Sequence, residues 1–169
     1  TKKGRLVDQM KIKDGPINVA QTIKLSNAVI ILSDKGNFAV LKDRIIPLKQ
    51  WLKEYYLPTE IDFATFDKNR LTLYHDHGKK FTEISFSTFG TALKSRTGNL
   101  DLKLPKGSRV QLVAENQGNA FLFLGDDLLY KFSRNKCSKI SINSDMSFTH
   151  LNGMMLDNLG DLWINNDNG

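Results

Sequence analysis

The chain has 169 residues, of which 40% are hydrophobic and 25% are charged, and its net charge is +6. This size and composition predict one globular domain, or two small ones, and exclude a disordered chain. The single cysteine, Cys137, excludes an internal disulfide and a cysteine-based zinc site. No apolar run approaches the roughly 20 residues that a helix needs to span a membrane.

A short pattern recurs four times along the chain: an apolar strand, a polar turn and a second apolar strand. Three of the turns combine an acidic residue with a Gly that is followed by Asn or Asp, and such residues accept the positive φ angles of tight hairpins. The copies begin on average about 40 residues apart, which is close to the period of propeller blades. They span residues 29–41, 62–74, 112–124 and 154–164.

Further strands are predicted beside these hairpins, at Arg44–Leu48, Lys80–Phe86, Leu128–Phe132 and Lys139–Ile142. Several short strands per unit are typical of a propeller blade or a β-sandwich. We therefore predict an all-β fold of β-propeller-like antiparallel repeats, with residues 1–169 forming a single partial β-propeller domain. A plain series of β-hairpins is the alternative. The predicted blade-like units lie near residues 28–48, 61–86, 109–142 and 147–169.

Residues 47–57 break the strand pattern and predict a short helical insertion. Apolar and aromatic residues recur there at the spacing of one helix face, with Pro47 suited to the first turn and Pro58 to the end. Three aromatic residues of this face, Trp51, Tyr55 and Tyr56, are candidates for ligand binding, because aromatic rings stack on sugar rings. The simpler interpretation is that they dock the helix on the sheet. Residues 87–107 fit a short helix, a long loop or an insertion.

The last stretch, MLDNLGDLWINNDNG (155–169), resembles the two-component regulator propeller repeat. Phe148-Thr149-His150 stand where the preceding strand of that repeat would begin, and residues 112–124 match it in part. The matching positions are Asp157, Gly160, Asp161, Leu162, Trp163, Ile164 and Gly169. Because the chain ends inside this fourth copy, we expect it to form part of a larger propeller completed by further chain or by another subunit.

The resemblance implies a periplasmic sensor domain of a membrane-bound hybrid histidine kinase. Receptors of this family commonly detect oligosaccharides, and their kinase and membrane segments lie outside the propellers. The motif itself implies a structural role. Strand alternation places Leu162 and Ile164 on one side of the sheet and Trp163 on the other, where it would fill the space between blades. Asp157 and Asp161 are expected to bind backbone amides of the turn.

The sequence contains few groups arranged for catalysis or metal binding. His75 and His77 could share a metal if both lay on a strand, but no third ligand is evident nearby. Neighbouring cations could lower the pKa of Cys137, although a passive cysteine is the simpler interpretation. Because no hydrolase elbow, phosphate-binding loop or zinc-protease motif occurs, we predict no catalytic residues, no metal and no cofactor.

Basic residues form three groups, but acidic residues are mixed among them, which favours a solvated surface over a nucleic-acid site. The predicted function is therefore extracytoplasmic ligand sensing for a two-component receptor, with an oligosaccharide as ligand. The alternatives are a protein-interaction scaffold without a small ligand and a basic β module that binds nucleic acid or another polyanion. The basic groups are Lys2, Lys3, Arg5, Lys11 and Lys13, then Lys79 and Lys80, then Lys103, Lys106 and Arg109.

Overall fold

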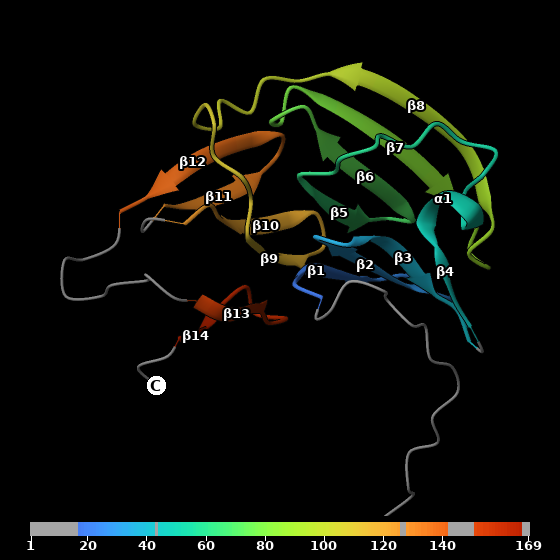
Figure 1. The fold of residues 1–169 in the computed structure, drawn as a ribbon, viewed down its shortest axis with the longest axis horizontal. Helices are drawn as coiled ribbons and strands as arrows, with labels where there is room; N and C mark the ends of the chain where they lie inside the picture. The colour runs from blue at the N-terminus through green and yellow to red at the C-terminus, as the bar shows by residue number, and fades with distance from the viewer. Residues whose placement is uncertain (1–16, 43, 126–127, 142–150, 167–169) are drawn as a thin grey trace, which may run out of the picture.

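Four antiparallel sheets follow one another along the chain in a computed structural model that describes residues 17–42, 44–125, 128–141 and 151–166 (Figure 1). Sheet I contains β1 (Val19–Lys24), β2 (Val29–Ser33), β3 (Gly36–Val40) and β4 (Ile45–Pro47). Sheet II contains β5 (Phe63–Asp67), β6 (Arg70–His75), β7 (Lys80–Phe86) and β8 (Ala92–Asn99). Sheet III contains β9 (Leu112–Asn116), β10 (Asn119–Phe123), β11 (Leu129–Ser133) and β12 (Lys136–Ile140). Sheet IV contains β13 (Leu151–Leu156) and β14 (Leu162–Asn166).

Each of the first three sheets is a meander in which every strand pairs with the next one in the chain. Tight turns make this possible, because both central residues of several hairpins adopt positive φ. Lys68 and Asn69 do so between β5 and β6, and Gln117 and Gly118 do so between β9 and β10. This is the backbone conformation of a type I′ turn, whose twist matches that of the flanking strands. The all-β fold of antiparallel repeats is confirmed.

The sheets stack face to face in chain order, and each interface is filled by apolar side chains. Ile30 of sheet I and Leu71 of sheet II belong to the first cluster, together with Leu48 and Leu52. Phe63 of sheet II meets sheet III in a second cluster. A third cluster lies between the other face of sheet III and sheet IV. The inner sheets therefore bury both faces, which explains their nearly continuous apolar runs.

The first strand of each sheet lies at the centre of the stack. The strands β1, β5 and β9 contact one another, and β13 contacts β9. The last strands, β4, β8 and β12, lie at the periphery (Figure 1). Polar groups of the central strands also join neighbouring sheets. The side-chain amide of Gln21 bonds both backbone groups of Ala64, at 2.7 and 2.9 Å, and a carboxylate oxygen of Glu115 accepts the N–H of Phe66 at 3.0 Å.

The structure differs from the predicted local structure in several details. The short helical insertion is present, but α1 covers only Leu48–Trp51 of the predicted residues 47–57, and turns follow it up to residue 55. Strand β1 was assigned to no unit, and β8 lies inside the stretch 87–107. The last strand of sheet III is Lys136–Ile140 rather than Lys139–Ile142. Phe148-Thr149-His150, Gly169 and the basic group at residues 2–13 lie outside the described residues.

Within the described ranges, no helix has the length and apolar character required to cross a membrane.

Candidate functional site

A pocket on sheet II has a volume of about 550 Å³. This volume falls in the range of small-molecule sites, about 300–1,000 Å³. The pocket lies where β6 ends, β7 begins and β8 ends, and the loop after α1 passes over it. Its lining residues are Tyr56, His75, Lys80, Phe81, Thr97, Gly98 and Asn99.

Strand register places the polar side chains of the pocket on one face of the sheet. His75 pairs with Lys80, and Lys80 pairs with Asn99, so the three residues form a row across β6, β7 and β8. Thr97 lies two residues before Asn99 and therefore shares its face. Farther along β6 and β7, sheet I covers the same face of sheet II, at Leu71, Leu73 and Ile84. The pocket is thus the uncovered end of a sheet face, and it presents an imidazole, an ammonium group, a hydroxyl and an amide.

The turn between β6 and β7 sets the edge of the row. Asp76, His77 and Gly78 all have positive φ, between 55° and 70°. The carboxylate of Asp62 accepts the N–H of Gly78 at 2.9 Å, and burial raises the pKa of this carboxyl group. Gly78 has a φ of 70°, which residues with a side chain adopt only with strain. A Cβ atom at this position would also lie 3.0 Å from the side chain of Leu102, so a larger residue would be crowded as well.

His75 and Lys80 differ in charge and in access to solvent. Only 8% of His75 is exposed, its Nε2 lies 3.4 Å from the Thr82 hydroxyl oxygen, and burial lowers its pKa. The imidazole is therefore neutral at pH 7 and offers one donor and one acceptor. The Lys80 ammonium lies 3.0 Å from a carboxylate oxygen of Asp76, and the two side chains are about half exposed, at 53% and 42%. Lys80 is the only lining residue with a formal charge at pH 7.

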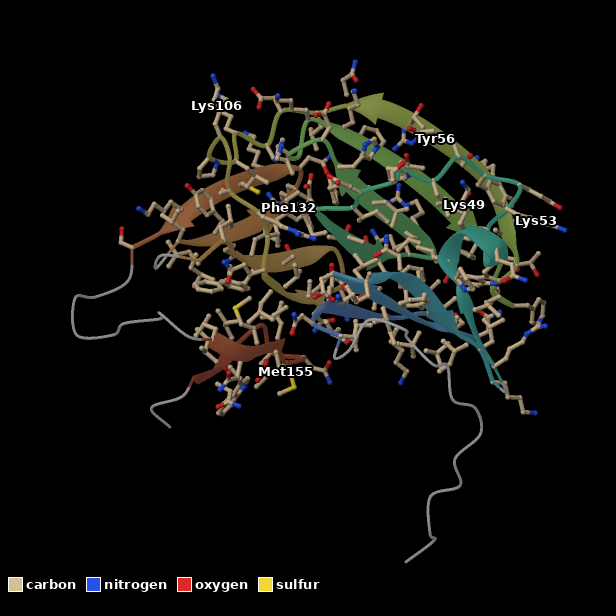
Figure 2. All side chains as sticks on the ribbon, in the orientation of Figure 1. Lys49, Lys53, Tyr56, Lys106, Phe132 and Met155 are labelled. Atoms are coloured by element: carbon tan, nitrogen blue, oxygen red, sulfur yellow. The ribbon has the colours of Figure 1, made fainter. Side chains whose placement is uncertain are left out.

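The three predicted ligand-binding aromatic residues are divided between two pockets. Tyr56 lines the pocket on sheet II and is 64% exposed (Figure 2). Trp51 and Tyr55 line a second pocket of about 320 Å³, beside Gly90 and Thr91. Trp51 also stacks on Phe86 with ring centroids 5.9 Å apart. Both Trp51 and Tyr55 pack against the cluster between sheets I and II, so docking on the sheet accounts for them.

The turn between β13 and β14 has the structural role that the repeat motif implies. One carboxylate oxygen of Asp157 accepts the backbone N–H groups of Leu159 and Asp161, and the other accepts the indole N–H of Trp163 at 3.0 Å. Asp161 was also expected to bind turn amides through its side chain, but it contributes its backbone N–H instead. Leu162 and Ile164 pack toward sheet III, whereas Trp163 lies on the opposite face and is 60% exposed. The predicted alternation of these side chains is confirmed, but Trp163 does not fill a space between two of the described sheets.

Cys137 lies on β12, where it packs against the cluster between sheets II and III. Burial raises the pKa of its thiol to about 11, so the neighbouring cations do not activate it. At pH 7.5 we expect iodoacetamide to alkylate Cys137 roughly a hundredfold more slowly in the folded protein than in urea, because only the thiolate reacts. Mass spectrometry of quenched samples measures both rates, and equal rates would contradict the burial of the thiol.

His75 and His77 do not form a metal pair. His75 ends a strand, whereas His77 lies in the following turn with φ of 55°. Within the described part of the chain, no group of three His, Cys, Asp or Glu residues could hold a metal ion.

Tyr56, a candidate of the sequence analysis, lines the pocket, whereas four polar lining residues were not among the candidates: His75, Lys80, Thr97 and Asn99. Thr97 and Asn99 were missed because β8, the strand that supplies them, was not recognised as a strand. Its eight residues, ALKSRTGN, contain few apolar side chains, since β8 is an exposed edge strand. The nearly continuous polar run from Lys94 to Asn99 shows no apolar alternation, so the sequence carried no clear strand signal there.

Comparison with known proteins gives no family. No protein-family description matches the chain, and no curated protein matches it. One solved structure with a similar arrangement is PorZ of Porphyromonas gingivalis, described as an essential bacterial surface component of the type-IX secretion system. The identity is 14% and the TM-score is 0.36, and the match covers 88% of this chain. The chain spans only 23% of the length of PorZ.

Proposed function

We propose that this chain is the extracytoplasmic ligand-sensing part of a two-component receptor and that it binds an oligosaccharide in the pocket on sheet II. The pocket carries the proposal for ligand binding. Sugars expose both apolar C–H faces and many hydroxyl groups, so their sites combine an aromatic ring with several hydrogen-bonding side chains. Tyr56 supplies an exposed ring, and His75, Lys80, Thr97 and Asn99 supply the polar groups.

The receptor context rests on the motif at residues 155–169. Its resemblance to the two-component regulator propeller repeat supports a periplasmic location and a larger propeller that includes these four sheets. The face-to-face stacking and the central position of β1, β5, β9 and β13 are consistent with consecutive blades. Ligand binding would shift the populations of two arrangements of the receptor, and a kinase outside this chain would respond to that shift. The chain itself would bind ligand without catalysing a reaction.

A panel of short neutral and acidic oligosaccharides tests the proposal by isothermal titration calorimetry. We expect Tyr56→Ala to weaken binding about five- to tenfold, because it removes the stacking ring, and Tyr56→Phe to keep most of the affinity. Phe89→Ala is the matched control, since Phe89 is 88% exposed and does not line the pocket. Equal affinities for Tyr56→Ala and Phe89→Ala would place the site elsewhere. Absence of binding across the panel would contradict the proposal.

A protein-interaction scaffold is the second candidate, and sheet IV favours it. Met155 and Trp163 pair across β13 and β14 on the face turned away from sheet III, and they are 59% and 60% exposed. Leu159, in the turn between these strands, is 89% exposed. Such an exposed apolar group is typical of a surface that another sheet or protein covers.

A further inference from the structure

The segment that supplies most of the pocket on sheet II is rich in positive charge. Residues 75–109, which form β7, β8 and their flanking turns, contain seven Lys or Arg residues and only three Asp or Glu residues. They therefore contribute most of the net charge of +6. The seven cations are Lys79, Lys80, Lys94, Arg96, Lys103, Lys106 and Arg109.

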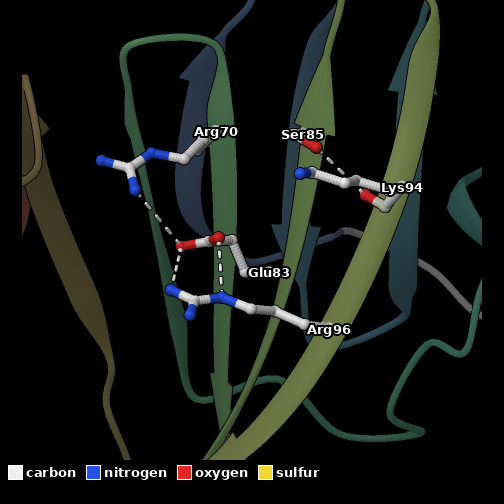
Figure 3. A network of polar contacts seen from close by, with 5 residues as sticks. All are labelled: Arg70, Glu83, Ser85, Lys94 and Arg96. Carbon is white, nitrogen blue, oxygen red and sulfur yellow. Dashed lines mark hydrogen bonds and ion pairs between the residues drawn. The ribbon is translucent and has the colours of Figure 1, made fainter.

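The three acidic residues of this segment are engaged by groups of the protein. Glu83 lies between two guanidinium groups: its oxygens accept two hydrogen bonds from Arg96, at 2.9 and 3.2 Å, and one lies 3.9 Å from Arg70 (Figure 3). Asp101 accepts the backbone N–H of Lys103 at 3.1 Å. Asp76 pairs with Lys80. Lys94 and Arg96 lie on the face of β8 opposite to Thr97 and Asn99, so they do not enter the pocket. The excess of positive charge in the segment still favours the approach of anions.

Lys80 brings this positive charge into the pocket. It is the central residue of the row formed with His75 and Asn99, and no carboxylate lines the pocket. Its contact with Asp76 joins two exposed side chains, and such a pair contributes little stability in water. An ammonium group has three hydrogen-bond donors. Lys80 can therefore bind an anionic group of the ligand either in addition to its contact with Asp76 or in place of that contact.

We infer that the ligand is an acidic oligosaccharide, with a carboxylate or sulfate group bound by Lys80 and a sugar ring placed against Tyr56. The neutral partners on either side of Lys80 fit the hydroxyl groups of the same sugar unit. His75 and Asn99 each offer donor and acceptor groups, and neither carries a charge that would repel an anion. This inference rests on the proposed function, because it specifies the ligand class of the same pocket.

Trigalacturonate and its fully methyl-esterified form provide a matched pair of ligands for the test. The two share a backbone, but esterification removes every negative charge. By calorimetry at low salt, we expect trigalacturonate to bind at least about tenfold more tightly, since a hydrogen bond between charged groups is stronger than a neutral one. A sulfated galactose oligomer and its desulfated form, tested in parallel, distinguish sulfate from carboxylate recognition.

Variants of two lysines locate the charge effect. Lys80→Gln should reduce the affinity for the acidic oligomer about tenfold and leave the affinity for the ester nearly unchanged, and Lys80→Arg should restore most of the loss. Lys49→Gln is the control, because Lys49 is an exposed residue of α1 that lines neither pocket. It removes the same charge from a residue outside the pocket.

The outcomes separate this inference from the proposed function. If the ester or the desulfated oligomer binds as tightly as the acid, and Tyr56→Ala weakens both, the pocket binds sugars but the inferred acidity is wrong. If Lys49→Gln weakens binding as much as Lys80→Gln, or duplex DNA binds as tightly as the acidic oligomer, diffuse polyanion binding replaces the inferred site. If no oligosaccharide binds, both the inference and the proposed function fail.

Discussion

Phe132→Ala is expected to lower the free energy of unfolding by about 3–5 kcal/mol, because it removes a large side chain from the interface between sheets II and III. Phe132 is 1% exposed, and its ring meets those of Phe63 and Tyr74 at centroid distances of 5.3 and 5.0 Å. Phe63 and Tyr74 stack on each other at 4.4 Å. Both partners come from sheet II, so neighbouring strands would have to move before the cavity could close.

Urea unfolding followed by circular dichroism measures this effect. Phe89→Ala removes the same side chain from a position that is 88% exposed, and it should change the free energy by less than about 0.5 kcal/mol. Phe132→Leu keeps most of the apolar volume and gives an intermediate value if the alanine variant does not fold. A loss of less than about 1 kcal/mol for Phe132→Ala would show that sheets II and III do not pack as described.

Gln21→Leu is expected to cost about 2–4 kcal/mol, although it replaces a polar side chain with an apolar one in a buried position. Gln21 is 2% exposed on β1, and its amide donates to the carbonyl of Ala64 and accepts the Ala64 N–H. Leucine fills a similar volume but leaves both backbone groups of β5 without their partner. The cost therefore comes from two unsatisfied groups rather than from a cavity.

The matched control for this change is Gln50→Leu, since Gln50 is an exposed residue of α1. It should leave the urea midpoint nearly unchanged. Hydrogen exchange provides a second measurement, because the Ala64 amide should lose protection in Gln21→Leu more than the amides of β10 do. Equal stability of Gln21→Leu and the unmodified protein would contradict the bond between sheets I and II.

Local sequence signals predicted the strand pairs with tight turns well, because their information lies within a few residues. The turn at Asn69 and the turn at Gly118 are found where the residue types allow positive φ. Strand β7 has the predicted bounds, Lys80–Phe86. The strands that were missed, β1 and β8, are edges of their sheets and have mixed composition, with Gln21 buried in one and most of the other exposed.

The helical insertion was predicted to be longer than it is, for a related reason. The spacing of Leu48, Trp51, Leu52 and Tyr55 is helical, and these four side chains do pack against the cluster between sheets I and II. One helical turn followed by further turns is enough to place them there, however, so the periodicity of the apolar residues does not require a longer helix. The ring of Tyr56, by contrast, lies outside that cluster and reaches the pocket.

The sequence by itself determined the all-β class, the repeated hairpins and the role of Asp157 in its turn, because turn chemistry and strand alternation act between near neighbours. Only the tertiary structure decided which polar residues form the pocket. His75, Lys80 and Asn99 meet through the register of three strands, and Tyr56 joins them from a loop after α1. Register and sheet stacking depend on apolar contacts between distant segments, so the position of the site was not readable from spacing along the chain.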